Sequence, residues 1–84
     1  MQKQGLRLRI DWASSDNSTH IDVYDESRFE NASSEYLEKV FYEIIEAISS
    51  GKKCFFIDLK DAKIMYKTEK IESVLLYYGK IEHN

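Results

Sequence analysis

Few side chains in this sequence are of a type and spacing that could perform chemistry. His20 and His83 are the two histidines, and His83 is the penultimate of 84 residues. Cys54 is the single cysteine and begins an apolar segment, where a structural thiol is more common than a nucleophile. Asp58 stands near the end of that segment, where α/β sheets often hold functional residues, although a capping carboxylate is the more common finding.

Motifs that usually accompany catalysis or metal binding are absent from the sequence. It contains no Cys-x-x-Cys pair, no His-x-x-x-His pair and no glycine-rich phosphate loop. His20 and Asp22 lie on one face of an expected strand, but a metal site needs a third ligand that the sequence does not identify. Acid–base catalysis needs two carboxylates in different environments, whereas nearly all acids here fall on faces or loops expected to be exposed. We therefore expect no enzymatic activity, no cofactor and no metal site.

Acidic residues are concentrated in the middle of the chain. Residues 11–46 carry ten acidic and two basic residues, a net charge of −8, whereas the whole chain carries −3. Phosphate groups are bound by cations, so we expect no direct binding of nucleic acid or of an anionic membrane through this region. A solvated acidic face is the simplest explanation, and a basic protein partner is the functional one.

The expected location is cytoplasmic. The sequence shows neither a signal-peptide pattern nor an apolar run long enough to span a membrane. A single cysteine can form no internal disulfide, which argues against a disulfide-stabilised secreted protein.

An antiparallel hairpin is predicted for the N-terminal quarter. Residues 6–12 alternate apolar and charged side chains, and residues 19–24 resume the alternation after a polar turn. In the second strand, Ile21 and Val23 are expected to face the core. The outward positions of that strand would be His20, Asp22 and Tyr24.

A helix is predicted to begin near Ser33 or Ser34, which can cap it, and to stop at Gly51. Its buried stripe has helical spacing and consists of Leu37, Val40, Phe41, Ile44, Ile45 and Ile48. On the opposite side, an arc of about 140° is acidic. This acidic face consists of Glu35, Glu38, Glu43 and Glu46.

The last third is expected to supply a buried strand and a second helix. Residues 54–59 are mostly apolar on both sides of the period-two pattern, which is typical of a central strand. A strand, a helix and a buried strand suggest a right-handed crossover with parallel pairing. Residues 71–78 fit helical spacing and also alternate like a strand. We favour a helix capped by Thr68, because two helices would cover both faces of the sheet. The expected fold is a single α/β domain of residues 1–84, with α+β as the alternative, in the order β-β-α-β-α with a mixed sheet.

The order of elements and several short motifs resemble the STAS domain of anti-sigma factor antagonists. The motifs are residues 21–24, the helix end at residues 50–53, and the segment Phe-Phe-Ile-Asp-Leu that begins at Phe55. Residues 26–32 also resemble the opening segment of SiaC-like regulatory phosphoproteins, which are relatives of the same fold. The resemblance covers residues 19–79. It departs from the family at residues 66–69, where the family has Asp-Ser-Ser-Gly.

The resemblance implies a phosphorylation-controlled switch. In such families a Ser or Thr that opens the second helix is phosphorylated by a partner kinase, and this decides which protein is bound. The matching residue is Thr68, and a phosphate at a helix N-terminus would meet unpaired N–H groups and the helix dipole. An ordinary N-cap is the alternative. The expected partner-binding residues are Asp25, Glu26, Arg28, Glu30, Asn31, Thr68, Glu69, Ile71 and Glu72.

Two function classes remain open. The leading prediction is a non-enzymatic bacterial regulator that binds a kinase, a phosphatase or an anti-sigma-like protein. The alternative is a small acidic decoy, of the kind that phages encode, which inhibits a nucleic-acid-binding protein through the acidic face. A chain this short would leave part of its sheet uncovered, which suggests a homodimer, a partner-binding surface or a minimal version of the fold. A small structural subunit is the third and simplest interpretation.

Overall fold

Two antiparallel sheets and a single helix make up the computed structural model, which describes residues 3–81 and therefore leaves His83 outside. The elements in chain order are β1 (Lys3–Ala13), β2 (Thr19–Asp25), the 3-10 turn η1 (Glu26–Arg28), α1 (Ser34–Ser49), β3 (Cys54–Asp58), β4 (Lys63–Lys67), the 3-10 turn η2 (Thr68–Lys70) and β5 (Ile71–Ile81). The fold is therefore α+β. Among residues 3–81, no helix combines the length and apolar character needed to cross a bilayer.

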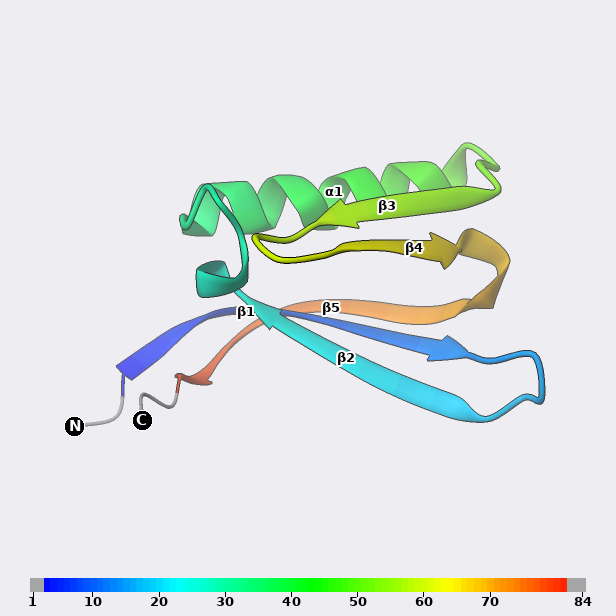
Figure 1. Cartoon of the computed structure of the whole chain (residues 1–84), viewed down its shortest axis with the longest axis horizontal. Helices are drawn as coiled ribbons and strands as arrows, with labels where there is room; N and C mark the ends of the chain where they lie inside the picture. The colour runs from blue at the N-terminus through cyan, green and yellow to red at the C-terminus, as the bar shows by residue number, and fades with distance from the viewer. Residues whose placement is uncertain (1–2, 82–84) are drawn as a thin grey trace.

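The helix and a hairpin lie together on one side of a three-stranded sheet (Figure 1). The sheet has the strand order β2-β1-β5, and β3 and β4 form the separate hairpin. Between these layers lies one core, to which every strand and α1 contribute. Its fully buried side chains include Leu8 and Ile10 of β1, Leu37 and Ile44 of α1, and Ile57 of β3.

The predicted β1–β2 hairpin is confirmed, but its second strand faces the other way. Leu8 lies opposite Tyr24, and Ile10 lies opposite Asp22. Directly opposed residues of an antiparallel pair share one face of the sheet. Because Leu8 and Ile10 face the core, Tyr24 and Asp22 face it as well. Ile21 and Val23, which we expected in the core, are 54% and 37% exposed.

The helix agrees with the sequence at both ends and on its acidic face. The Ser33 hydroxyl accepts a hydrogen bond from the Tyr36 N–H at 3.2 Å, and Gly51 after the helix has a φ of 79°. The buried stripe differs from the prediction at three positions. Ile45 and Ile48 are exposed, and Ala47 is buried instead. The acidic face is exposed along its whole length, at Glu35, Glu38, Glu43 and Glu46.

The predicted second helix is wrong. Residues 71–81 form β5, which pairs antiparallel with β1 along nearly its full length. The apolar spacing of this segment fits a helix and a strand equally well. Pairing decides between them, because β1 offers a free edge of matching length and places Leu76 opposite Leu8 and Val74 opposite Ile10.

The predicted parallel crossover into a central strand is also wrong. β3 pairs with β4 alone, and this pairing is antiparallel. Its inner side chain Ile57 is buried, whereas Cys54, Phe56 and Asp58 on the outer side are exposed. β3 therefore belongs to a two-stranded layer with one covered face, and Asp58 pairs with Lys63 at the surface at 3.6 Å.

The turn that closes the β1–β2 hairpin generates a testable pH dependence. Hydrogen bonds from the Ser14 hydroxyl and from the Ser18 N–H lower the pKa of Asp16 to about 2 from 3.8. A carboxyl with a lowered pKa contributes stability above its unfolded pKa, and this contribution is lost as the pH falls toward 2. We expect the stability advantage of wild type over Asp16→Asn to shrink between pH 4 and pH 2, measured by urea denaturation.

Asp61→Asn is the matched control, because Asp61 is exposed and makes no side-chain hydrogen bond in the part of the chain that the structure describes. An advantage of wild type over Asp16→Asn that stays constant through this pH window would contradict the assignment.

Candidate functional site

The side of the three-stranded sheet that faces away from α1 carries no covering element within residues 3–81 (Figure 1). Alternation along the paired strands places every second side chain on this side. We call it the open face and define it by nine residues. They are Arg7, Arg9 and Asp11 of β1, Ile21, Val23 and Asp25 of β2, and Ser73, Leu75 and Tyr77 of β5.

Apolar side chains on the open face are exposed. Ile21, Val23 and Leu75 are 54%, 37% and 49% exposed, and Tyr77 beside them is half-buried. The outer side of an antiparallel sheet is usually polar, because it faces water. Exposed apolar side chains that gather on one face are typical of a protein interaction site. The open face therefore has the character of an interface.

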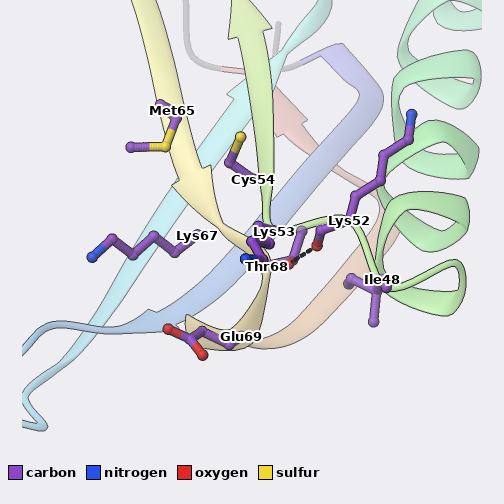
Figure 2. A pocket seen from close by; sticks show the side chains of 9 residues that line it. Ile48, Lys52, Lys53, Cys54, Met65, Lys67, Thr68 and Glu69 are labelled. Atoms are coloured by element: carbon purple, nitrogen blue, oxygen red, sulfur yellow. Dashed lines mark hydrogen bonds between the residues drawn. The ribbon is translucent and has the colours of Figure 1, made fainter.

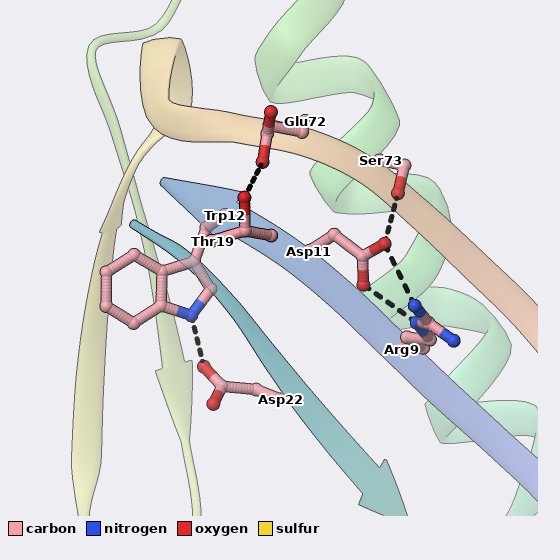
Figure 3. A network of polar contacts seen from close by, with 7 residues as sticks. All are labelled: Arg9, Asp11, Trp12, Thr19, Asp22, Glu72 and Ser73. Atoms are coloured by element: carbon pink, nitrogen blue, oxygen red, sulfur yellow. Dashed lines mark hydrogen bonds and ion pairs between the residues drawn. The ribbon is translucent and has the colours of Figure 1, made fainter. Parts of the chain in front are cut away.

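A charged stripe runs along β1 through the middle of the open face (Figure 3). The Arg9 guanidinium donates to both oxygens of Asp11, at 2.7 Å from Nε and 3.2 Å from Nη2. The Ser73 hydroxyl of the neighbouring strand also donates to Asp11, at 3.0 Å. The hydrogen bond from Arg9 lowers the pKa of Asp11, which keeps the carboxyl ionised.

Arg7 lies beside this stripe without a carboxylate partner among the described residues. Its side chain passes over Gly79, where an added Cβ would come within 2.9 Å of the Arg7 Cδ. A glycine at this position gives the arginine room to lie flat across β5. The Arg7 Nε is buried and donates no hydrogen bond within residues 3–81. Arg7 lies opposite Asp25 of β2 in the sheet, but no ion pair joins these two side chains within residues 3–81.

A second polar cluster lies on the inner side of the sheet and joins the two sheets. The Asp22 carboxylate accepts hydrogen bonds from Trp12 Nε1 at 2.7 Å and from the Tyr66 hydroxyl at 2.6 Å. The Tyr24 hydroxyl lies 2.5 Å from that of Tyr66. Because an ionised carboxylate only accepts, Tyr66 donates to Asp22, and Tyr24 donates to Tyr66. Burial, with the contact to Asp22, raises the pKa of Tyr66 far above its usual range.

This cluster borders a cavity of about 370 Å³ between the β1–β2 turn and β4. Trp12 and Tyr66 line the cavity, and His20 stacks on the Trp12 ring at 4.4 Å. The sequence interpretation missed the cluster because it placed Asp22 and Tyr24 on the outer side of β2. The alternation of residues 6–12 was the available signal, since it fixes which side of β2 faces inward once the register is known.

Thr68 does not open a helix, in contrast to the prediction. It begins the three-residue turn η2, so the helix dipole that was expected to receive a phosphate is absent. Its hydroxyl donates to the Lys52 carbonyl, and its N–H donates to the Lys53 carbonyl at 3.1 Å. Thr68 thus ties η2 to the connection between α1 and β3.

A cavity of about 670 Å³ beside Thr68 is lined by three lysines but does not form an anion site. Lys52 and Lys67 point in opposite directions from the chain around Thr68 (Figure 2). Their ammonium groups therefore do not converge on one position where a phosphate could be held.

The predicted partner-binding residues fall into two groups at opposite ends of β3 (Figure 1). One end is marked by the hydrogen bond from the Lys60 N–H to the Arg28 carbonyl, and the other by that from Thr68 to Lys53. The group at the first end consists of Asp25, Glu26, Arg28, Glu30 and Asn31. The group at the second consists of Thr68, Glu69, Ile71 and Glu72. They do not form the single contact surface that we expected.

Local contacts account for several members of these groups. Asp25 caps η1 by accepting from the Ser27 N–H at 2.9 Å, and Asn31 accepts from the Ser33 hydroxyl at 3.0 Å. The Arg28 guanidinium lies 5.7 Å from the centre of the Tyr24 ring. Among residues 3–81, no three side chains of His, Cys, Asp or Glu are grouped as a metal site requires.

The inner cluster gives a prediction about stability. Tyr66→Phe removes the hydroxyl that donates to Asp22 and leaves Tyr24 without its buried partner. We expect the free energy of unfolding to fall by about 1–3 kcal/mol, because buried polar groups lose their hydrogen bonds. Tyr42→Phe is the control, since Tyr42 is 65% exposed on α1. Chemical denaturation that gives equal stability for the two variants would show that the cluster does not join the sheets.

Comparisons with known proteins identify no relative. No family model, no curated protein sequence and no solved structure matches this chain. The resemblance to STAS domains therefore stays a prediction, and its second helix is absent from the described residues. Any assignment of function depends on the geometry of the chain itself.

Proposed function

We propose that this protein is a non-enzymatic regulator that acts by binding another protein chain through the open face. The observation that supports the proposal is the uncovered apolar patch of Ile21, Val23 and Leu75 around the Arg9–Asp11 pair. On the other side of the sheet, Leu6, Leu8 and Ile10 of β1 are buried beneath α1 and the β3–β4 hairpin. A face that exposes side chains of the core type is stabilised when a partner covers it.

The composition of the open face suits a protein partner. Protein interfaces are enriched in Tyr and Arg. The open face offers Tyr77, Arg7 and Arg9 beside its aliphatic side chains. By its resemblance to anti-sigma factor antagonists, the partner would be a kinase, a phosphatase or an anti-sigma-like protein.

Thr68 enters the proposal as a control point. Its hydroxyl holds η2 against the α1–β3 connection, and η2 leads directly into β5, which carries Leu75 and Tyr77. A phosphate on Thr68 would remove the donated hydrogen bond and add negative charge beside Glu69. Modification would then act on the open face through the position of β5.

The acidic decoy remains the second candidate, because all four glutamates of the acidic face are exposed. Their charge density is low for this role. Glu46 lies eleven positions after Glu35, which is about 16 Å of helix at about 1.5 Å per residue. Four charges over this length give about one per 5 Å, whereas duplex DNA carries one per about 1.7 Å. The open face is therefore the stronger candidate.

Affinity capture with matched variants tests the proposal. Leu75→Glu places a charge on the open face, and Tyr42→Glu places one at an exposed position on α1. We expect proteins retained by wild type and by Tyr42→Glu, including other copies of the chain, to be lost by Leu75→Glu. Mass spectrometry of each sample reads the result, and circular dichroism checks that both variants fold. Retention that is the same for all three proteins would refute an interface on the open face.

A neutralised acidic face tests the second candidate in the same assay. The variant combines Glu35→Gln, Glu38→Gln, Glu43→Gln and Glu46→Gln. We expect it to retain the same proteins as wild type at about 50 mM salt and again at about 300 mM salt, because none of the four glutamates lies on the open face. A decoy would instead lose its nucleic-acid-binding target in this variant, and wild type would lose it at the higher salt concentration.

A further inference from the structure

We infer that the partner of the open face is a second copy of this chain, packed face to face with β1 over β1 in antiparallel orientation. The inference rests on the proposed function and adds the identity of the partner to it. Three observations carry it, namely the order of charges along β1, the positions of the apolar side chains and the extent of the face.

The order of charges selects one arrangement. On the open face, β1 presents Arg7, Arg9 and Asp11 in sequence, and Arg9 is already paired with Asp11. A twofold axis that lies across the strands and passes over Arg9 places each Arg7 opposite the Asp11 of the other copy. A twofold axis along the strands would place Arg7 opposite Arg7 and Asp11 opposite Asp11. Opposite charges attract and like charges repel, so the antiparallel arrangement is favoured.

This arrangement also gives Arg7 an ion-pair partner, because its own neighbour Asp25 accepts a hydrogen bond from the Ser27 N–H of η1 and forms no ion pair with Arg7. Asp11 is ionised and 21% exposed at its side chain, so it has room to accept from outside. The resulting network would be Arg9 and Ser73 from one copy and Arg7 from the other, all donating to one Asp11 carboxylate. Both ends of the interface would contain this network, because the twofold axis repeats it.

Apolar contacts fall on the same axis. Val23 and Leu75 flank Arg9 in the sheet, on β2 and β5, so each would meet its own counterpart in the second copy. Two packed sheets bury such side chains between them, as in a β-sandwich. The exposed fractions of Val23 and Leu75 would fall, and the sheet would gain the cover that α1 provides on its other side.

The extent of the face predicts a weak but specific dimer. β1 and β5 each have eleven residues. At about 3.4 Å per residue and about 4.8 Å per strand, three strands present a face of about 500 Å². Two copies would bury about 1,000 Å², which is the lower limit for a specific interface and suits a micromolar dissociation constant. We therefore expect monomer and dimer to exchange in the concentration range of ordinary biophysical measurements.

Charge exchange between two variants tests the inference by sedimentation equilibrium from about 1 µM to 1 mM protein. In Arg7→Asp, each aspartate would oppose Asp11 of the other copy, and in Asp11→Arg two arginines would oppose each other. We expect each variant alone to dimerise at least about tenfold more weakly than wild type, because close charge pairs are strongly coupled. We expect an equimolar mixture to recover dimerisation, since both opposed pairs then attract. Recovery in the mixture also shows that the variants are folded.

A cysteine cross-linking experiment tests the geometry. In a Cys54→Ser background, Leu75→Cys lies near the proposed axis and should be cross-linked into a dimer by a short bismaleimide, because packed sheets lie about 10 Å apart, which is too far for a direct disulfide. Tyr42→Cys is the control on α1 and should stay monomeric. Val23→Cys mixed with Leu75→Cys should give no mixed dimer above the level of the control, whereas the rejected arrangement would favour it. A mixed dimer, or no dimer from Leu75→Cys, would overturn the arrangement.

The two proposals can fail separately. If the protein stays monomeric at about 1 mM but Leu75→Glu still loses captured partners, the inference of a second copy is wrong. The open face would then be an interface for another protein. If the protein dimerises but neither charge variant weakens the dimer and Leu75→Cys is not cross-linked, the antiparallel face-to-face contact is wrong. If the protein is monomeric and Leu75→Glu retains the same proteins as wild type, both proposals are wrong.

Discussion

The register of β1 is the constraint on which the rest of this fold depends. β1 lies between β2 and β5, so the inward positions of one strand determine the inward positions of all three. Leu8 opposes Tyr24 on one side and Leu76 on the other. A shift of one residue would move the core side chains to the solvent side, so burial beneath α1 fixes the register. The same register assembles the open face from alternate residues of three strands.

The inner cluster around Asp22 connects the three-stranded sheet to the β3–β4 hairpin. Tyr66 comes from β4, yet its hydroxyl meets Asp22 and Tyr24 of β2. A half-buried carboxylate without these donors would be costly, so the cluster favours one placement of the hairpin over the sheet. The polar contacts therefore orient the two layers, while apolar contacts of Leu37, Ile44 and Ile57 hold them together.

Sequence patterns predicted the elements better than their arrangement. The helix, its Ser33 cap, the turn at Gly51 and the first hairpin were all correct, because they depend on contacts between near neighbours. The side of β2 was wrong because Ile21 and Val23 are more apolar than Asp22 and Tyr24, and the hydrogen bonds that stabilise Asp22 come from Trp12 and Tyr66. An uncovered part of the sheet was expected, but its residues were not identified, because Ile21 and Val23 were placed in the core. The expected contact surface near Thr68 proved to be divided.

The sequence by itself determined the turn of the first hairpin, where α1 begins and ends, and which helical face is acidic, since turn residues, capping, glycine conformation and helical spacing are local properties. Only the tertiary structure decided that residues 71–81 form a strand, because their apolar spacing fits both periods and β1 supplied the pairing edge. It also decided that Arg7, Arg9, Ile21 and Leu75 share one uncovered face. Residues so distant in sequence come together through strand pairing, and no local pattern records that pairing.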